Sequence, residues 1–363
     1  MPFKEIYRSQ RFRIIILLII IILIKAFALN SSWVEKYYAL FFFPGLSNLL
    51  RITTGWLHIS IGDLLYLFAG LWLLYKLIRF FISLLLKRRQ GKSLSRTLIK
   101  ILITGMFIYI IFNIFWGLNY NRKGIAYQLN LDTTKYNTVD LINIQKLLLY
   151  KLNESKQALI NNNEGYPDKR NLFIKARDCY SQIDSAYPFL NYKNASTKSS
   201  LFSWWGNYFG FTGYYNPFSG EAQVNTTVPR FIMPYTTCHE IAHQLGYAKE
   251  DEANFVGYLS ATSSRDTLFH YSAYLDLFLY ANREVFFIDS GSAKQAYMQL
   301  VPGVKADLKE WREFLIRHRS PLDPIMTWLY GKYLKANQQP NGMSTYNEVI
   351  ADVIAFYKKT GKL

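Results

Sequence analysis

Long, nearly uninterrupted apolar runs occupy the first third of the chain, and a periodic pattern of apolar and polar positions occupies the rest. The runs extend over residues 12–29, 64–86 and 98–118. Each has about the 20 residues that a helix needs to cross a bilayer. The sequence therefore predicts three membrane spans in a membrane region of residues 1–121, and the second is the least regular because it contains Lys76 and Arg79.

Basic residues predict how these spans are oriented. Most of the basic residues of this region lie in two short segments, one at the start of the first run and one between the second and third runs: Lys4, Arg8, Arg11, Arg13, Lys87, Arg88, Arg89, Lys92 and Arg96. Such clusters mark cytoplasmic loops, so the N-terminus is predicted to be cytoplasmic and the chain after the third span extracytoplasmic. The alternative, that Ala26-Phe27-Ala28 ends a cleavable signal peptide, leaves the orientation of the rest unchanged.

After Asn121 charges of both signs appear and apolar residues recur at helical spacing. Helices are predicted over residues 139–159, over residues 172–187 and from residue 235 onward. The segment 209–231 is rich in aromatic residues, Gly and Thr, and it predicts strands joined by a tight turn. The predicted class is α+β: transmembrane helices followed by a mostly helical extracytoplasmic domain of residues 122–363 with a small β-sheet.

The chain of 363 residues carries 42 Lys and Arg against 25 Asp and Glu, a net charge of +17. Residues 1–121 account for +12 of that charge and the remainder for +5. Positive charge that accompanies apolar segments argues against a nucleic-acid-binding protein, whose basic residues cover a soluble face. The broken apolar stretch 40–62 is predicted to lie in the membrane interface, and Trp116 and Tyr120 are predicted to form an interfacial aromatic belt.

Residues 239–243 read His-Glu-Ile-Ala-His. Positions four apart share a helix face, so His239 and His243 can both direct imidazole nitrogens at one metal ion. Glu240 would lie beside that ion as general base for a water molecule. Gly246 is a natural stop for the helix.

A catalytic zinc ion usually has three protein ligands, and the next acidic residues are Glu250, Asp251 and Glu252. Here the sequence resembles gluzincin-like metallopeptidases, in which HExxH is followed by E-x-x-A-[D/N]. That resemblance implies Zn²⁺ as cofactor, Glu250 as third ligand and Asn254 as a residue that supports a ligand. Glu252 stays open as the alternative ligand.

Taken whole, the chain resembles a family of uncharacterised bacterial membrane proteins, domain of unknown function 3810. Three segments carry the resemblance: HEIAHQLGYAKEDEANF, GFTGYYNPFSGEAQVN upstream and GMSTYNEVIADVIAFYKK near the C-terminus. The resemblance implies a zincin-like fold in a bacterial membrane protein. With the basic loops, it predicts a place in the inner membrane, with the C-terminal domain periplasmic or otherwise extracytoplasmic. It implies no particular substrate.

The segment upstream of the motif could bind substrate, because an extended peptide can add to the edge of a sheet. The candidate residues are Gly213, Tyr214, Tyr215, Asn216, Glu221 and Asn225. The alternative is that Tyr214, Tyr215, Pro217 and Phe218 only form the core and turn of a hairpin.

Other candidates are weaker. Tyr258 and His270 lie where an oxyanion donor could stand, although packing residues show the same spacing. His58 and His318 are interpreted as an interfacial and a solvated side chain. Cys179 and Cys238 could form one disulfide, but a bridge beside the ligand helix is less favoured than two buried free thiols.

Three hypotheses follow from the sequence. The first is a membrane-anchored zinc metallopeptidase that hydrolyses peptides or proteins outside the cytoplasm. The second is a zincin-fold binding or scaffold protein of the cell envelope with little hydrolysis. The third is a transporter or channel, supported only by Lys76 and Arg79 within a span. The sequence predicts no oligomeric state.

Overall fold

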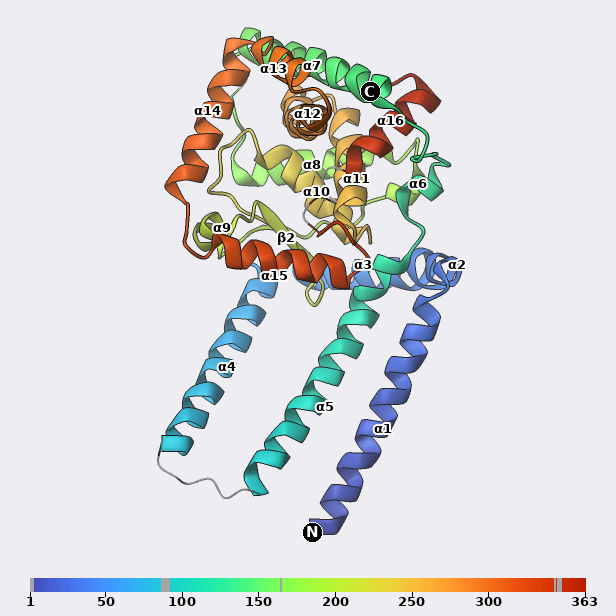
Figure 1. Cartoon of the computed structure of the whole chain (residues 1–363), viewed down its shortest axis with the longest axis vertical. Helices are drawn as coiled ribbons and strands as arrows, with labels where there is room; N and C mark the ends of the chain where they lie inside the picture. The colour runs from blue at the N-terminus through green and yellow to red at the C-terminus, as the bar shows by residue number, and fades with distance from the viewer. Residues whose placement is uncertain (1–2, 86–91, 164, 343, 345–347) are drawn as a thin grey trace.

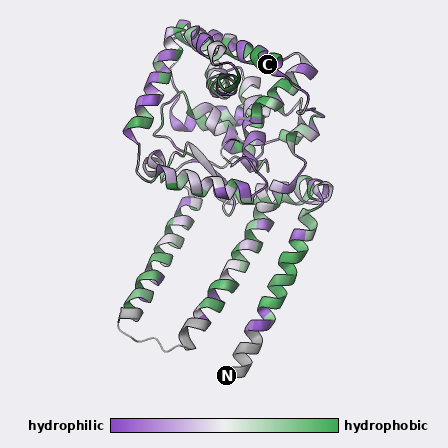
Figure 2. Cartoon of the chain, in the orientation of Figure 1, coloured by the Kyte–Doolittle hydropathy of each residue, from purple (hydrophilic) through white to green (hydrophobic). Residues whose placement is uncertain are grey.

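The three predicted spans are helices that leave the same end of a helical body (Figure 1). In the computed structural model, which describes residues 3–85, 92–163, 165–342, 344 and 348–363, they are α1 (Phe3–Ala28), α4 (Ile61–Leu85) and α5 (Lys92–Phe115). Hydrophobic residues cover most of their length (Figure 2). Among the described residues, α4 and α5 are each long and apolar enough to cross a membrane. Residues 10–28 of α1 meet the same criteria only as a pair with residues 31–55, and a bend of 91° separates the two segments. Two or three helices can therefore cross a membrane, as the predicted membrane association requires.

The N-terminus lies at the far end of these helices from the body (Figure 1). α1 and α5 pack on each other. Lys87, Arg88 and Arg89, on which the orientation argument partly rests, lie outside the described residues. The orientation in the membrane therefore stays a prediction.

The segment between α1 and α4 runs across the end of the body as α2 (Ser31–Trp33), the π-helical η1 (Val34–Phe42) and α3 (Phe43–Gly55). The buried positions of α3 include the polar residues Ser47, Arg51 and Thr54. Its exposed apolar positions include Leu49 and Ile52, and Trp56 follows directly. An interfacial helix is amphipathic in this way, so α3 keeps the predicted interfacial character on one face and packs against the body with the other.

Helices from the whole C-terminal region build the body. Their bounds are η2 (Gly117–Asn121), α6 (Gly124–Gln128), α7 (Thr138–Asn161), α8 (Lys169–Ile183), η3 (Pro188–Leu190), α9 (Ser203–Phe209), α10 (Met233–Gln244), α11 (Glu250–Ser263), α12 (Thr267–Ile288), α13 (Ser290–Met298), α14 (Pro302–Arg317), α15 (Asp323–Ala336) and α16 (Val349–Thr360). One hydrophobic core joins α7, α8, α10, α11, α12 and α16. α10 lies between α11 and the sheet, and this position places the HExxH residues at the centre of the body.

The sheet has three short strands: β1 (Thr197–Ser199), β2 (Gly213–Asn216) and β3 (Glu221–Val224). Their order is β1-β3-β2, with β1 parallel and β2 antiparallel to β3. The β2–β3 hairpin confirms the strands and turn predicted within residues 209–231. The sequence does not predict β1, because three residues that pair with a distant strand leave no alternating pattern. A mostly helical fold with a small sheet is therefore confirmed.

Two predictions for single residues are settled by burial. Trp116 and Tyr120 are 4% and 5% exposed, so they form no aromatic belt and instead pack where α5 enters the body. The sequence cannot distinguish an aromatic belt at the membrane surface from aromatic residues packed inside the body, since both can directly follow the end of a span. Cys179 and Cys238 are buried free thiols, the interpretation that the sequence favoured.

Candidate metal centre

Helix α10 carries the HExxH residues and is buried along its whole length. Pro234 lies in its first turn, where the missing N–H costs no helical hydrogen bond. The helix ends before Gly246, whose φ of +90° is a left-handed conformation that favours glycine. The spacing of four puts His239 and His243 on one face, with ring centroids 4.7 Å apart.

Helix α11 brings a third side chain with a metal-ligating atom to this face. Glu250 Oε2 lies 3.3 Å from His239 Nε2 and 3.7 Å from His243 Nε2. Ligand atoms of these three buried residues all lie within 4.8 Å of one another, so the three side chains could hold a metal ion. Gly257 permits the close approach of the two helices, because a Cβ atom there would lie 3.0 Å from the His239 backbone nitrogen.

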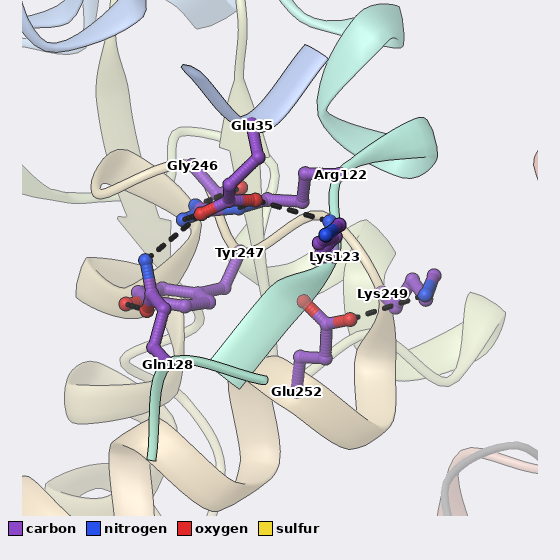
Figure 3. A network of polar contacts seen from close by, with 8 residues as sticks. All are labelled: Glu35, Arg122, Lys123, Gln128, Gly246, Tyr247, Lys249 and Glu252. Carbon is purple, nitrogen blue, oxygen red and sulfur yellow. Dashed lines mark hydrogen bonds and ion pairs between the residues drawn. The ribbon is translucent and has the colours of Figure 1, made fainter. Parts of the chain in front are cut away.

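Glu252, the alternative ligand, lies elsewhere. Its Oε1 accepts a hydrogen bond from Lys249 Nζ at 3.1 Å, and its carboxylate packs directly on Gly124. Figure 3 shows this ion pair near Arg122 and Tyr247. The structure thus places Glu250 in the cluster and Glu252 at the junction with the membrane region.

Hydrogen bonds behind the cluster hold two of the ligands in position. His243 Nδ1 lies 2.6 Å from the Tyr247 carbonyl oxygen, to which it donates when Nε2 is the metal-facing atom. The Tyr330 hydroxyl on α15 donates to Glu250 Oε1 at 2.7 Å and leaves Oε2 toward the histidines. Asn254, on α11, lies close enough to His239 to raise the pKa of that imidazole, and its role in supporting a ligand stays a prediction.

The charges of the cluster are strongly coupled. Burial lowers the pKa of His239, and the neighbouring side chains of Glu250 and Asn254 only partly oppose that effect. Burial also disfavours a charged His243, but its contacts with Glu250 outweigh that cost and raise the pKa to about 9. Burial raises the pKa of Glu250, whereas its two histidine partners hold it well below the ordinary value. A buried carboxylate between two imidazoles therefore favours positive charge at this point, which a divalent cation would supply.

Glu240 lies on the same helix and differs from Glu250 in its surroundings. Its side chain is buried, and its Oε2 has no hydrogen-bond partner among the described residues. Burial raises the pKa of Glu240 to about 8. Gly213, at the start of β2, packs against it so closely that a Cβ atom there would lie 2.5 Å from Glu240 Oε1. The strand and the acid are thus in direct contact.

A cavity of roughly 600 Å³ opens onto the cluster. Of the substrate-binding candidates, Gly213, Tyr214 and Tyr215 line it. α12 adds Asp276, Tyr280 and Arg283 to its wall, and α15 adds Met326, Thr327, Tyr330 and Tyr333. Many of the lining side chains are aromatic, which suits a ligand with apolar groups and a few directed polar contacts.

The other three substrate-binding candidates form hydrogen bonds within the body and are not among the described residues that line this cavity: Asn216, Glu221 and Asn225. Asn216 Oδ1 accepts hydrogen bonds from two backbone nitrogens of the hairpin turn. Glu221 accepts from the Ile61 and Gly62 nitrogens at 3.1 and 2.5 Å, and so caps the N-terminus of α4. Asn225 Nδ2 donates to Asn207 Oδ1 at 2.7 Å. These three residues therefore contact other parts of the body.

Comparison with known protein families matches residues 38–354 to a family described as a protein of unknown function, DUF3810. This match covers most of the chain. The chain belongs to this family. No curated protein and no solved structure matches the chain. The predicted family membership is confirmed, while the metallopeptidase resemblance stays a prediction.

The residues that match DUF3810 include α4, α5 and the cluster of His239, His243 and Glu250. They also include four cavity residues that no motif predicted: Trp116, Tyr120, Tyr330 and Tyr333. Tyr330 lies 80 positions from Glu250 in sequence, so only the fold reveals their contact. Tyr258, His270 and His318 are absent from the described lining of the cavity, and His270 Nε2 instead contacts the Ser264 carbonyl oxygen at 2.6 Å.

Proposed function

We propose that this protein is a membrane-anchored, zinc-dependent peptidase with a zincin-like arrangement of ligand and base helices. The observation that carries the proposal is the buried cluster of His239, His243 and Glu250 with the unpartnered Glu240 oxygen on the same helix. The test is metal analysis of the purified full chain, followed by digestion of a peptide library with and without a chelator. We expect about one zinc ion per chain and cleavage that the chelator abolishes. A chain that binds no metal, or cleaves equally in chelator, would contradict the proposal.

The donor set supports zinc as the metal. Two imidazole nitrogens and one carboxylate oxygen are ligands that Zn²⁺ prefers, and three protein ligands leave a further position for water or substrate. When bound there, Zn²⁺ supplies Lewis acidity that polarises a carbonyl group and lowers the pKa of water. A nearby cation also favours the ionised form of a carboxyl group, which Glu240 needs in order to accept a proton.

Glu240 is the proposed general base and acid. Its carboxylate would take a proton from the attacking water and deliver it to the leaving amine. Burial removes competing water from this carboxylate, and its free Oε2 has no other hydrogen bond to break among the described residues. No other carboxylate on α10 competes for this role.

The edge of the sheet supports an extended peptide as the substrate. β2 is an outer strand of the sheet. The Asn225 nitrogen donates to the Thr212 carbonyl, and bonded pairs alternate along an antiparallel ladder. The backbone groups of Gly213 and Tyr215 therefore point away from β3, where a peptide could add as a further strand.

The proposed location follows from the spans. If the basic loops are cytoplasmic, the body with the metal cluster lies on the other side of the bacterial inner membrane, in the periplasm. Peptide substrates would then be extracytoplasmic.

Replacing Gly213 with Ala is expected to reduce kcat for peptide hydrolysis by roughly 10²-fold, because the new Cβ would displace the Glu240 carboxylate. Zinc content should stay unchanged, since the three atoms nearest to the new Cβ all belong to Glu240. The measurement is kcat together with metal analysis. Gly165→Ala is the matched control, because nothing lies within 4 Å of a Cβ there; equal activity in both variants would contradict the placement of Glu240.

Replacing Tyr330 with Phe is expected to weaken zinc binding about 10–100-fold, because it removes the hydrogen bond that holds Glu250 Oε1. A competition titration with a zinc chelator of known affinity measures the change. Tyr333→Phe is the control: its hydroxyl contacts Tyr120 at 2.9 Å and no ligand. If both variants bind zinc as the wild type does, Tyr330 does not position Glu250.

A further inference from the structure

An apolar surface covers the end of the body from which the membrane helices leave. On α15 and just before it, the exposed apolar residues Leu322, Ile325, Trp328 and Leu329 recur at helical spacing, each about half exposed or more. Next to it, α9 exposes Trp204 and Trp205. The outer face of α3 adds Leu49, Ile52 and the following Trp56. We call these nine residues the basal face.

The basal face and the membrane helices share one end of the molecule. Figure 1 shows α3, α9 and α15 across the end of the body at which α4 and α5 enter it. Exposed apolar patches of this extent mark a protein or membrane contact. Trp is enriched where a membrane meets water, and Lys332, whose ammonium lies over the Trp328 ring at 5.7 Å, adds a positive charge on α15.

The metal cluster lies close to this end. Trp116 directly follows α5, and its ring centroid is 5.9 Å from that of His243 and 4.5 Å from that of Tyr215. Tyr120, in the next turn, shares a hydrogen bond with Tyr333 of α15. Helix α5, which can cross a membrane, thus ends next to Trp116, whose ring packs against His243 of the cluster.

α15 connects the basal face with the cluster. One side carries Trp328 and Leu329, and another carries Tyr330, which donates to Glu250. Since α15 also walls the cavity, any surface that binds its apolar side lies directly beside the cluster.

We infer that the basal face rests in the headgroup layer of the membrane that α4 and α5 cross, so that the cavity serves polypeptides attached to that membrane. We assign the bilayer as the partner of the basal face because this face is continuous with the helices that are proposed to cross the membrane. The substrate class is a peptide segment next to a transmembrane or lipid anchor, and this part rests on the proposed function. A freely diffusing peptide would lack the anchor that keeps it at this surface.

The docking part is tested in nanodiscs of phosphatidylethanolamine and phosphatidylglycerol, with the full chain carrying a fluorescent label on a single new cysteine. Trp328→Cys reports on α15, and Phe287→Cys is the control, a 73% exposed position at the end of α12. The two native cysteines are buried, and labelling of the wild-type chain serves as the control for any reaction at these two residues. We expect quenching by headgroup-region doxyl lipids to be at least about twofold stronger at position 328, since interfacial helices lie within about 5–10 Å of the headgroup boundary. Equal quenching at both positions would overturn the inference.

The substrate part is tested with one peptide sequence, presented on a lipid anchor and free in solution. We expect wild-type chain in the same nanodiscs to cleave the anchored peptide faster, and the pair W328S and L329S to lose that preference while cleaving the free peptide as before. Equal cleavage of both peptides by the wild type overturns the substrate class. Cleavage of neither peptide, with quenching intact, overturns the proposed peptidase activity and leaves the docking in place.

Discussion

Replacing Glu240 with Gln is expected to abolish most peptide hydrolysis, about 10²–10⁴-fold in kcat, while the chain still binds zinc. Gln has nearly the same shape but cannot accept a proton from water. The three ligand side chains are untouched, so the metal should remain. The measurement is kcat on a cleaved library peptide, with zinc content determined on the same preparation.

Glu252→Gln is the matched control for this prediction. Glu252 is as deeply buried a glutamate as Glu240, at 6% against 3% exposure, but it contacts Lys249 and not the cluster. We expect it to retain both zinc and hydrolysis. Full activity in the Glu240 variant would refute its role as base, and loss of zinc in the Glu252 variant would refute the ligand assignment. Zinc binding without any cleavage by the wild type would favour the scaffold hypothesis.

Replacing Arg122 with Ala is expected to lower the free energy of unfolding by about 3–5 kcal/mol, because it leaves the buried carboxylate of Glu35 without a counter-charge. Arg122 Nη2 and Nε donate to Glu35 at 3.0 and 3.2 Å, and Nη1 donates to the Gly246 carbonyl at 3.1 Å. Figure 3 shows this network, in which Gln128 Nε2 and the Lys123 backbone nitrogen also donate to Glu35, each at 3.0 Å. Thermal unfolding in detergent measures the loss.

Two further variants isolate the cause of that loss. Lys151→Ala removes an exposed ion pair with Glu154 and should change stability by less than about 1 kcal/mol. The double variant Glu35→Gln with Arg122→Met should be more stable than Arg122→Ala, because neither charge is then left alone in the interior. Equal losses in the Lys151 and Arg122 variants would contradict a structural role for the buried pair.

The sequence predicted the parts of the site that depend on local spacing. His239 and His243 lie four apart on one helix, and the chain turns back at Gly246 to begin α11 with Glu250. Both relations are fixed by helix geometry and a short turn, so they can be inferred without the fold. The choice between Glu250 and Glu252 could not be made, because it depends on which side of α11 faces α10.

The parts that sequence reasoning missed depend on contacts between distant segments. Tyr330 approaches Glu250 only because α15 crosses the end of the body, and Trp116 approaches His243 only because α5 enters beneath α10. Glu221 is the reverse case, a residue that the sequence proposed for substrate binding and that the structure uses elsewhere. From β3 its carboxylate accepts hydrogen bonds at the N-terminus of α4. A buried acid at a helix end and one at a catalytic site have the same appearance in a single sequence.

The cap that α3 provides for the ligand helix has a consequence for release from the membrane. Ser47 Oγ and Arg51 Nη1 donate to the Gln244 carbonyl at 2.7 and 3.0 Å, at the last residue of α10. These donors belong to the segment between the first two membrane helices, as Glu35 does. A proteolytic cut near residue 121 would free the body from its anchor and remove the helix cap in the same event. The membrane region therefore supports helix α10 as well as anchoring the body, and a body released by such a cut would lose part of the support of its His239–His243–Glu250 cluster.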